Sequence, residues 1–230
     1  MSFFDWLNQP RSFTQFEDHY ALTRDSLFGA LKKPINDCVE QHDLVLLVAH
    51  FPECFTQIES QLEAWDLDFE VVVNRIDQDW VSTVNKGQQY NHVFLTLAGM
   101  LVYNDDPEAR KKARAIQGER VQPVSMMVLE RHPQIGRDSR VAAFAKSIAN
   151  PVRLGYFLSL EDSVVTKLIN PQLVQLMQQM GLTDQELVTS NMLTRRLKRV
   201  LSRQVFTGVE APAESASEWY ELNAPDVDSV

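Results

Sequence analysis

The sequence has few glycines, which limits how it could bind phosphate. Only eight occur among 230 residues, at positions 29, 87, 99, 118, 136, 155, 181 and 208. Backbone amides approach a phosphate closely where glycine leaves room for it. These positions cannot form a G-x-x-x-x-G-K-[ST] loop or a G-x-G-x-x-G turn. The sequence therefore excludes a self-contained nucleotide site of either usual kind.

Cysteines and long apolar runs are also scarce. Cys38 and Cys54 are the two cysteines, too few for a disulfide framework or a cysteine metal site, so we expect reduced thiols. No segment approaches the roughly 18 uninterrupted apolar residues of a membrane-spanning helix. The first eleven residues lack the cationic flank and apolar run of a signal peptide. These absences predict a cytoplasmic protein that does not insert into membranes.

Catalytic signatures are missing as well. There is no H-E-x-x-H or G-x-S-x-G motif, and the five histidines share no ligand spacing. We therefore assign no catalytic, cofactor-binding or metal-binding residue and expect no cofactor. One alternative stays open: His50 and His132 each follow a predicted strand, where parallel strands place their ligands. They could share a site for a small ligand or a proton transfer, or be ordinary loop histidines.

The charge is acidic but uneven. The formal net charge is −9, and six carboxylates after residue 208 supply −6 of it, which leaves −3 for the body. A mildly acidic body argues against a grip on nucleic acid, which needs clustered Lys and Arg. It is compatible with a protein partner. The acidic residues of this last stretch are Glu210, Glu214, Glu218, Glu221, Asp226 and Asp228.

Short apolar runs alternate with helical patterns along the chain. This predicts an α/β fold: a mostly parallel sheet in three layers, with helices on both faces. Helices are predicted over 14–40, with a break at Pro34, after Pro52, and over 104–117, 162–180 and 183–204. Strands are predicted at Leu44–Ala49, Phe69–Val73, Val93–Ala98, Val124–Leu129 and Leu154–Leu160.

The chain divides into three parts by composition. Residues 1–17 form an N-terminal apolar segment, and residues 18–205 form one α/β domain with a helical C-terminal extension. Residues 206–230 are rich in Pro, Ala, Ser and acids, which predicts a disordered acidic tail apart from Trp219 and Tyr220. The aromatic side chains in this tail could recognise a partner or pack back on the domain.

Two motifs with matched spacing resemble a known family. Glu130-Arg131-His132 and the run from Phe157 to Asp162 resemble the ERH and FYLSMED stretches of the second helicase-type nucleotide-binding domain of SecA, the protein-export motor. The likeness covers about Asp18 to Arg203. It implies a RecA-like fold, related to P-loop NTPases. Further similar stretches are Tyr20–Thr23, Leu44–Val48, Cys54–Trp65, Leu173–Gly181 and Met192–Arg195.

The departures from SecA concern its phosphate-facing residues. Between the two motifs SecA carries QLRGRSGRQGD, whereas Arg140–Asn150 reads RVAAFAKSIAN. The three family arginines fall on Ala142, Phe144 and Ser147. Such arginines stabilise the charge that develops in phosphoryl transfer. None of these three arginines remains, so we expect no ATP hydrolysis. We also expect Phe144 to pack into the crevice at the strand ends, where an arginine of the family faces phosphate. The NMAGRGTD segment is reduced to Ala98 and Gly99 within Leu97–Asn104.

Three functions remain open. The first is a pseudoenzyme: a non-catalytic SecA-like domain that binds another protein or regulates it, with a link to protein export inherited from the resemblance. The second is a sensor that binds a nucleotide or another small ligand without hydrolysis. The third is nucleic-acid binding through Arg195, Arg196, Lys198, Arg199 and Arg203, which the acidic total disfavours. These cations could equally complement the helix C-terminus or dock against the tail.

Overall fold

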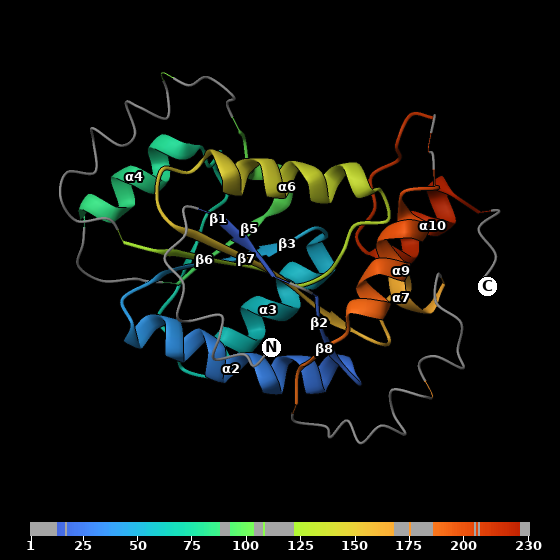
Figure 1. The fold of residues 1–230 in the computed structure, drawn as a ribbon, viewed down its shortest axis with the longest axis horizontal. Coiled ribbons are helices and arrows are strands. Elements are labelled where there is room, and N and C mark those ends of the chain that lie inside the picture. The colour runs from blue at the N-terminus through green and yellow to red at the C-terminus, as the bar shows by residue number, and fades with distance from the viewer. Residues whose placement is uncertain are drawn as a thin grey trace.

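The computed structural model describes residues 13–16, 18–87, 93–103, 108, 122–167, 175, 186–204, 206 and 208–225. Within these residues a mostly parallel sheet lies between layers of helices (Figure 1). The strand order is β4-β5-β3-β6-β7-β2-β8, and β1 also pairs with β7. This confirms the predicted α/β class. The strands are β1 Phe13–Gln15, β2 His19–Ala21, β3 Leu44–Ala49, β4 Glu70–Val71, β5 Val93–Leu97, β6 Val124–Val128, β7 Val152–Ser159 and β8 Val188–Thr189.

The centre of the sheet consists of the apolar runs that predicted it. β3 pairs in parallel with β5 on one side and β6 on the other, and all six of its residues are buried. Continuous apolar runs suit such a strand, because both of its faces are covered. β6 in turn pairs in parallel with β7. β7 also pairs in parallel with β1 and with β2, and β8 runs antiparallel to β2.

Helices cover both faces of the sheet (Figure 1). α2 (Arg24–Glu40) and α3 (Pro52–Ala64) pack on one face, and α4 (Gln78–Gly87) and α6 (Ile135–Ser147) pack on the other. Side chains alternate between the faces along each strand. In β3, for example, Val45 and Leu47 join the core under α2 and α3, whereas Leu46 and Val48 join the core under α6.

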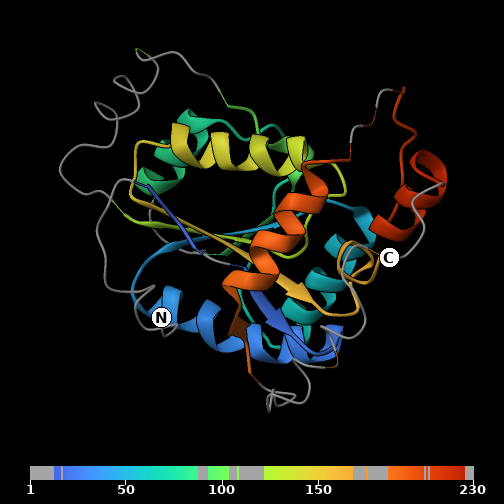
Figure 2. The same cartoon turned by 45° about the vertical axis from the view of Figure 1, so that its right-hand side comes forward.

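Three further helices lie together at one end of the sheet. They are α7 (Ser163–Thr166), α9 (Asn191–Leu201) and α10 (Ala216–Asn223), at the right of Figure 1. Figure 2 shows α9 standing across this end, between the layer of α2 and the end of α6. A single 3₁₀ turn, η1 (Ala98–Met100), follows β5.

The helix predicted over 14–40 is wrong at its start. Residues 13–15 and 19–21 are strands that extend the sheet beside β7, so tertiary pairing outweighs their helical spacing. The helix begins at Arg24, where Thr23 caps it by accepting a hydrogen bond from the Ser26 amide at 3.0 Å. It then runs through Pro34 to Glu40 without the predicted break.

Two predictions for the C-terminal part also need correction. Residues 188 and 189 form β8 rather than helix, and α9 begins only at Asn191. The disordered tail predicted from 206 is wrong for residues 208–225, because α10 buries Trp219 and Tyr220. The predicted strand at Phe69–Val73 shortens to Glu70–Val71. Residues 1–12 and 226–230, and most of the helices predicted over 104–117 and 162–180, lie outside the described residues.

The scarcity of cysteine and of long apolar runs has a structural counterpart. Cys38 and Cys54 are free thiols, both buried under α2 and α3. In the described part of the chain, no helix combines the length and apolar character that crossing a membrane requires.

Candidate functional site

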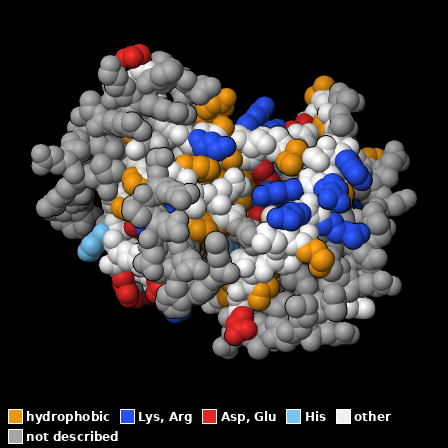
Figure 3. Space-filling model, in the orientation of Figure 1, with side chains coloured by type: hydrophobic (Ala, Val, Ile, Leu, Met, Phe, Trp, Pro, Cys, Tyr) orange, Lys and Arg blue, Asp and Glu red, His pale blue; other side chains and the backbone are white. Residues whose placement is uncertain are grey.

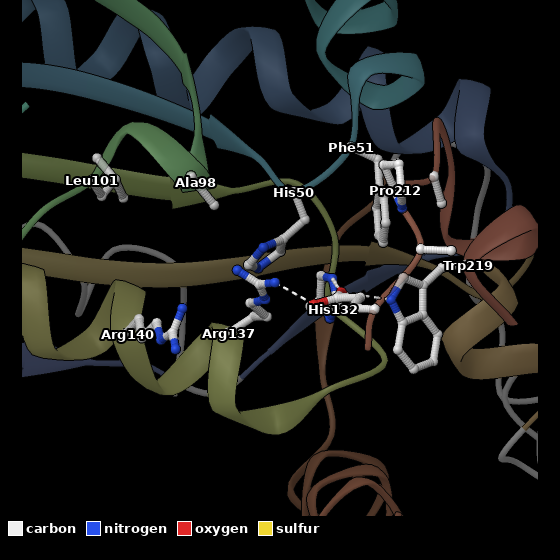
Figure 4. A pocket seen from close by; sticks show the side chains of 13 residues that line it. His50, Phe51, Ala98, Leu101, His132, Arg137, Arg140, Pro212 and Trp219 are labelled. Carbon is white, nitrogen blue, oxygen red and sulfur yellow. Dashed lines mark hydrogen bonds and ion pairs between the residues drawn. The ribbon is translucent and has the colours of Figure 1, made fainter. Parts of the chain in front are cut away.

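A crevice opens at the carboxyl ends of the parallel strands, where open α/β sheets place their ligands. β3, β5 and β6 end side by side here. The crevice has a volume of about 420 Å³ and lies between these strand ends, α6 and residues 208–225, which are called the C-terminal segment (Figure 4). It is lined by His50, Phe51, Ala98, Gly99, Leu101, His132, Arg137, Arg140, Glu210, Ala211, Pro212, Ala213 and Trp219.

The structure brings His50 and His132 together, as the strand-end hypothesis predicted. Their ring centroids are 5.3 Å apart, and His132 also stacks on Phe51 at 5.0 Å. Burial, and then the nearby His50, lower the pKa of His132 to about 3. His132 is therefore neutral at pH 7, although its Nε2 lies 3.6 Å from a Glu210 oxygen. Such a pKa does not suit proton transfer at neutral pH.

Two arginines of α6 supply positive charge to the crevice. Arg137 and Arg140 both line it, so the crevice carries positive charge although the arginines of the SecA motif are replaced. They come from the first two turns of α6, ahead of the positions that align with the SecA arginines. Of those aligned positions, Phe144 is fully buried in the core and does not line the crevice. The side chain that was expected to fill the crevice therefore packs elsewhere.

The C-terminal segment occupies the crevice instead, through the carboxylate of Glu210. One oxygen of this carboxylate pairs with Arg137, and the other accepts a hydrogen bond from Trp219 Nε1 at 2.7 Å. Figure 4 shows the dashed contacts converging beside His132. Arg140, by contrast, has no ion-pair partner among the described residues. The carboxylate of Glu210 therefore pairs with Arg137, one of the two arginines that line the crevice.

Several contacts hold the C-terminal segment in place. Trp219 and Tyr220 are 3% and 1% exposed, and Trp219 packs edge-on against His132 and Phe206. Asn223 closes a loop by exchanging hydrogen bonds with the backbone of Ala211 at 2.7 and 3.1 Å. The Glu53 amide at the start of α3 donates to the Glu214 carbonyl at 2.9 Å. The segment is therefore part of the domain.

Beneath the crevice, Arg131 organises a buried charge cluster. Its guanidinium donates to both oxygens of Asp18, at 2.7 and 2.6 Å, and to Asp138 at 2.6 Å. It lies 3.9 Å over the ring of Tyr156. Burial alone would raise the pKa of Asp138, but Arg131, His50 and the backbone amide of His132 together outweigh burial and lower that pKa. Asp138 also lies 2.9 Å from Nε2 of His50, so the cluster helps to position one wall of the crevice.

Glu130 fixes the turn that follows β3. Its Oε1 accepts hydrogen bonds from the amides of His50 and Phe51, both at 3.0 Å. Burial raises the pKa of Glu130 to about 7, against the opposing effect of Arg24. Arg24 also pairs with Asp162 at 2.9 Å. Arg24, Glu130 and Asp162 line a second, smaller cavity of about 220 Å³.

The described residues contain no group of three His, Cys, Asp or Glu side chains able to hold a metal ion. Of the two alternatives for Trp219 and Tyr220, packing back on the domain is the one that the structure has. Sequence reasoning missed the contributions of Glu210, Arg137 and the Arg131 cluster. One available signal was the capping-box spacing of Ser215 and Glu218, since Ser215 does accept a hydrogen bond from the Glu218 amide. The pairing of Arg137 with a residue 73 positions away had no local signal.

Comparisons with known proteins add little. No protein-family model matches the sequence, and no curated protein matches it. The structure is similar to the solved C-terminal part of the Fun30 ATPase domain, with 13% sequence identity and a TM-score of 0.39. The likeness covers 75% of this chain and 52% of that chain, so this chain spans about half the length of the solved protein. Similarity of this degree identifies neither a family nor a function.

Proposed function

We propose that this protein is a non-catalytic, SecA-like and therefore RecA-like domain that binds another protein or regulates it, with a role connected to protein export. The observation that carries the non-catalytic part is the carboxylate of Glu210 in the strand-end crevice. It pairs with Arg137, the kind of side chain that would otherwise bind a phosphate. The sequence also offers no glycine-rich phosphate loop. The connection to export rests on the SecA resemblance.

Nucleotide turnover and binding test the non-catalytic part. We expect no ATP hydrolysis by the purified protein, and a change in melting temperature below about 1 °C in millimolar ATP or ADP, because a ligand that does not bind the native state cannot stabilise it. Measurable turnover would overturn the proposal. The regulatory part is tested by affinity purification from the protein's own cells, where recovery of export components is the expected result.

A second candidate, a sensor for a small anionic ligand, is favoured by one observation. The crevice keeps about 420 Å³ of space beside Arg140, and a ligand that displaced Glu210 would gain Arg137 as well. Glu210→Gln separates the two candidates. A glutamine can still accept the Trp219 hydrogen bond but leaves Arg137 unpaired. If the sensor is correct, this variant binds phosphate-containing ligands more tightly than the wild type; if the crevice is closed, neither protein responds.

A further inference from the structure

The outward face of α9 carries an unusual concentration of positive charge. Leu193, Leu197 and Leu201 are fully buried, and Thr194 Oγ1 lies 3.2 Å from the Tyr20 hydroxyl. These contacts fix which side of the helix faces the core. The opposite side is exposed at Arg195, Arg196 and Arg199, with Lys198 half-buried and Arg203 exposed just beyond the helix. Figure 3 shows Lys and Arg side chains gathered where α9 lies. These five residues are called the α9 basic face.

Within the described ranges, no carboxylate pairs with the α9 basic face. No Asp or Glu occurs between Glu186 and Glu210 in the sequence, and none of the five cations forms an ion pair with a described residue. The predicted docking of these cations against the acidic segment is therefore not seen in residues 208–225, where Glu210 pairs with Arg137 instead. Four arginines outside this face are paired with carboxylates: Arg24 with Asp162, Arg131 with Asp18 and Asp138, Arg137 with Glu210, and Arg153 with Asp43.

Helix stability accounts for only part of this charge. Cations stabilise a helix only in its last turn, which can account for Lys198 and Arg199 but not for Arg195 and Arg196. Like charges three or four residues apart, such as Arg195 and Arg199, destabilise a helix by about 0.2–0.5 kcal/mol per pair. An anion bound across the face would relieve this repulsion. The arrangement therefore favours binding over stability.

We propose that the α9 basic face binds a short acidic segment of another protein. This rests on the proposed protein-binding function and names the partner's chemistry. Met192 is 57% exposed at the start of the helix, one turn from Arg195 and Arg196, so an apolar side chain of a peptide could pack there. From Met192 to Leu201 the helical rise is about 14 Å, which about four or five residues of extended peptide would span.

Nucleic acid fits this surface less well. The five cations are set in a chain of net charge −9, so the other residues sum to −9 − 5 = −14. A long polyanion leaving the helix would meet this acidic remainder, and nucleic-acid affinity depends on neutralising many phosphates. A short acidic segment needs only the helix. The arginine fork also binds carboxylates in a bidentate manner.

A peptide titration tests this proposal. The probe is a fluorescent eight-residue peptide of alternating Glu and Leu, measured by anisotropy at about 150 mM salt, with Gln in place of Glu as the uncharged control. We expect Arg195→Glu/Arg199→Glu to weaken binding at least about tenfold. The matched control, Lys32→Glu/Lys33→Glu on the exposed side of α2, carries the same change in net charge and should bind within about twofold of the wild type. Circular dichroism should show both variants folded.

Three results would overturn the proposal: no binding of the acidic peptide by the wild type, equal losses in the two double variants, or tighter binding of a single-stranded oligonucleotide than of the peptide. The last would assign the surface to nucleic acid. These outcomes differ from failure of the proposed function. If export components co-purify equally with the wild type and with Arg195→Glu/Arg199→Glu, the protein-binding module stands and only this surface is wrong.

Discussion

Arg131 and Arg199 carry the same guanidinium group in opposite surroundings. Arg131 is 2% exposed and bound to Asp18 and Asp138, whereas Arg199 is exposed and has no ion-pair partner within the described ranges. A buried charge costs several kcal/mol unless it is paired, so the fold requires the carboxylates around Arg131. It makes no such demand on α9. The comparison separates cations that hold the domain together from cations that are available for binding.

Removing the buried guanidinium should have the largest effect. Arg131→Met leaves Asp18 and Asp138 buried without their partner, and we expect the free energy of unfolding to fall by about 3–5 kcal/mol in urea denaturation. Arg196→Met on α9 is the matched control and should change it by less than about 0.5 kcal/mol. Similar losses in the two variants would break the comparison.

A substitution of Trp219 tests whether the C-terminal segment stabilises the domain, as Arg131 does, or is dispensable for stability, as we expect of the α9 cations. Its indole packs against His132 and Phe206 and donates to Glu210. Trp219→Ala should therefore cost about 3 kcal/mol of stability and make residues 208–225 susceptible to limited proteolysis. Leu222→Ala, at a side chain that is 51% exposed, should leave both measurements close to wild type. An undiminished stability in Trp219→Ala would mean that the segment does not support the fold.

The buried carboxyl of Glu130 should make the free energy of unfolding depend on pH. Because burial raises its pKa in the folded protein from 4.5 to about 7, the folded state binds more protons than the unfolded state between these values. The wild type should therefore lose stability as pH rises from about 4.5 to 7. Glu130→Gln removes the titration and retains an oxygen for the amides of His50 and Phe51. We expect the variant to exceed the wild type by about 3 kcal/mol at pH 8, measured by urea denaturation at each pH.

If the two stability profiles for Glu130 stay parallel from pH 4.5 to 8, the carboxyl does not titrate in this range and the prediction is wrong.

The smallest effect is expected at the crevice itself. Arg137 and Glu210 form a pair whose side chains are 39% and 22% exposed, intermediate between Arg131 and Arg199. Solvent screens such a pair, so Arg137→Gln should change the free energy of unfolding by less than about 1 kcal/mol. A loss as large as that of Arg131→Met would place Arg137 with the structural cations and argue against any ligand that displaces Glu210.

Much of the fold could be predicted from local patterns. The run at 44–49 is apolar throughout, and the run at 124–129 is apolar except for Ser125. Only a covered central strand suits such runs, so β3 and β6 were identified closely. Short edge strands carry no such pattern. β1, β2 and β8 have two or three residues each and exist because β7 or β2 offers them backbone partners.

The candidate site was less predictable. His50 and His132 were placed together because both follow strands of the same sheet edge. Glu210 and Trp219 could not be placed, because an acidic segment rich in Pro and Ala gives no sign of a docking position. Arg137 and Arg140 were not predicted to line the crevice, because the SecA alignment places the family's arginines at Ala142, Phe144 and Ser147, which lie farther along α6.

The sequence by itself determined the α/β class, the central strands, the absence of a glycine-rich phosphate loop and the absence of acidic residues along α9. Each follows from composition or short-range order, which needs no knowledge of distant contacts. Only the tertiary structure decided that Arg131 is neutralised, that Arg137 meets Glu210 and that the α9 cations have no described partner. Charge pairing depends on which residues meet across the fold: Arg137 and Glu210 are 73 positions apart in the sequence, and Arg131 and Asp18 are 113 apart.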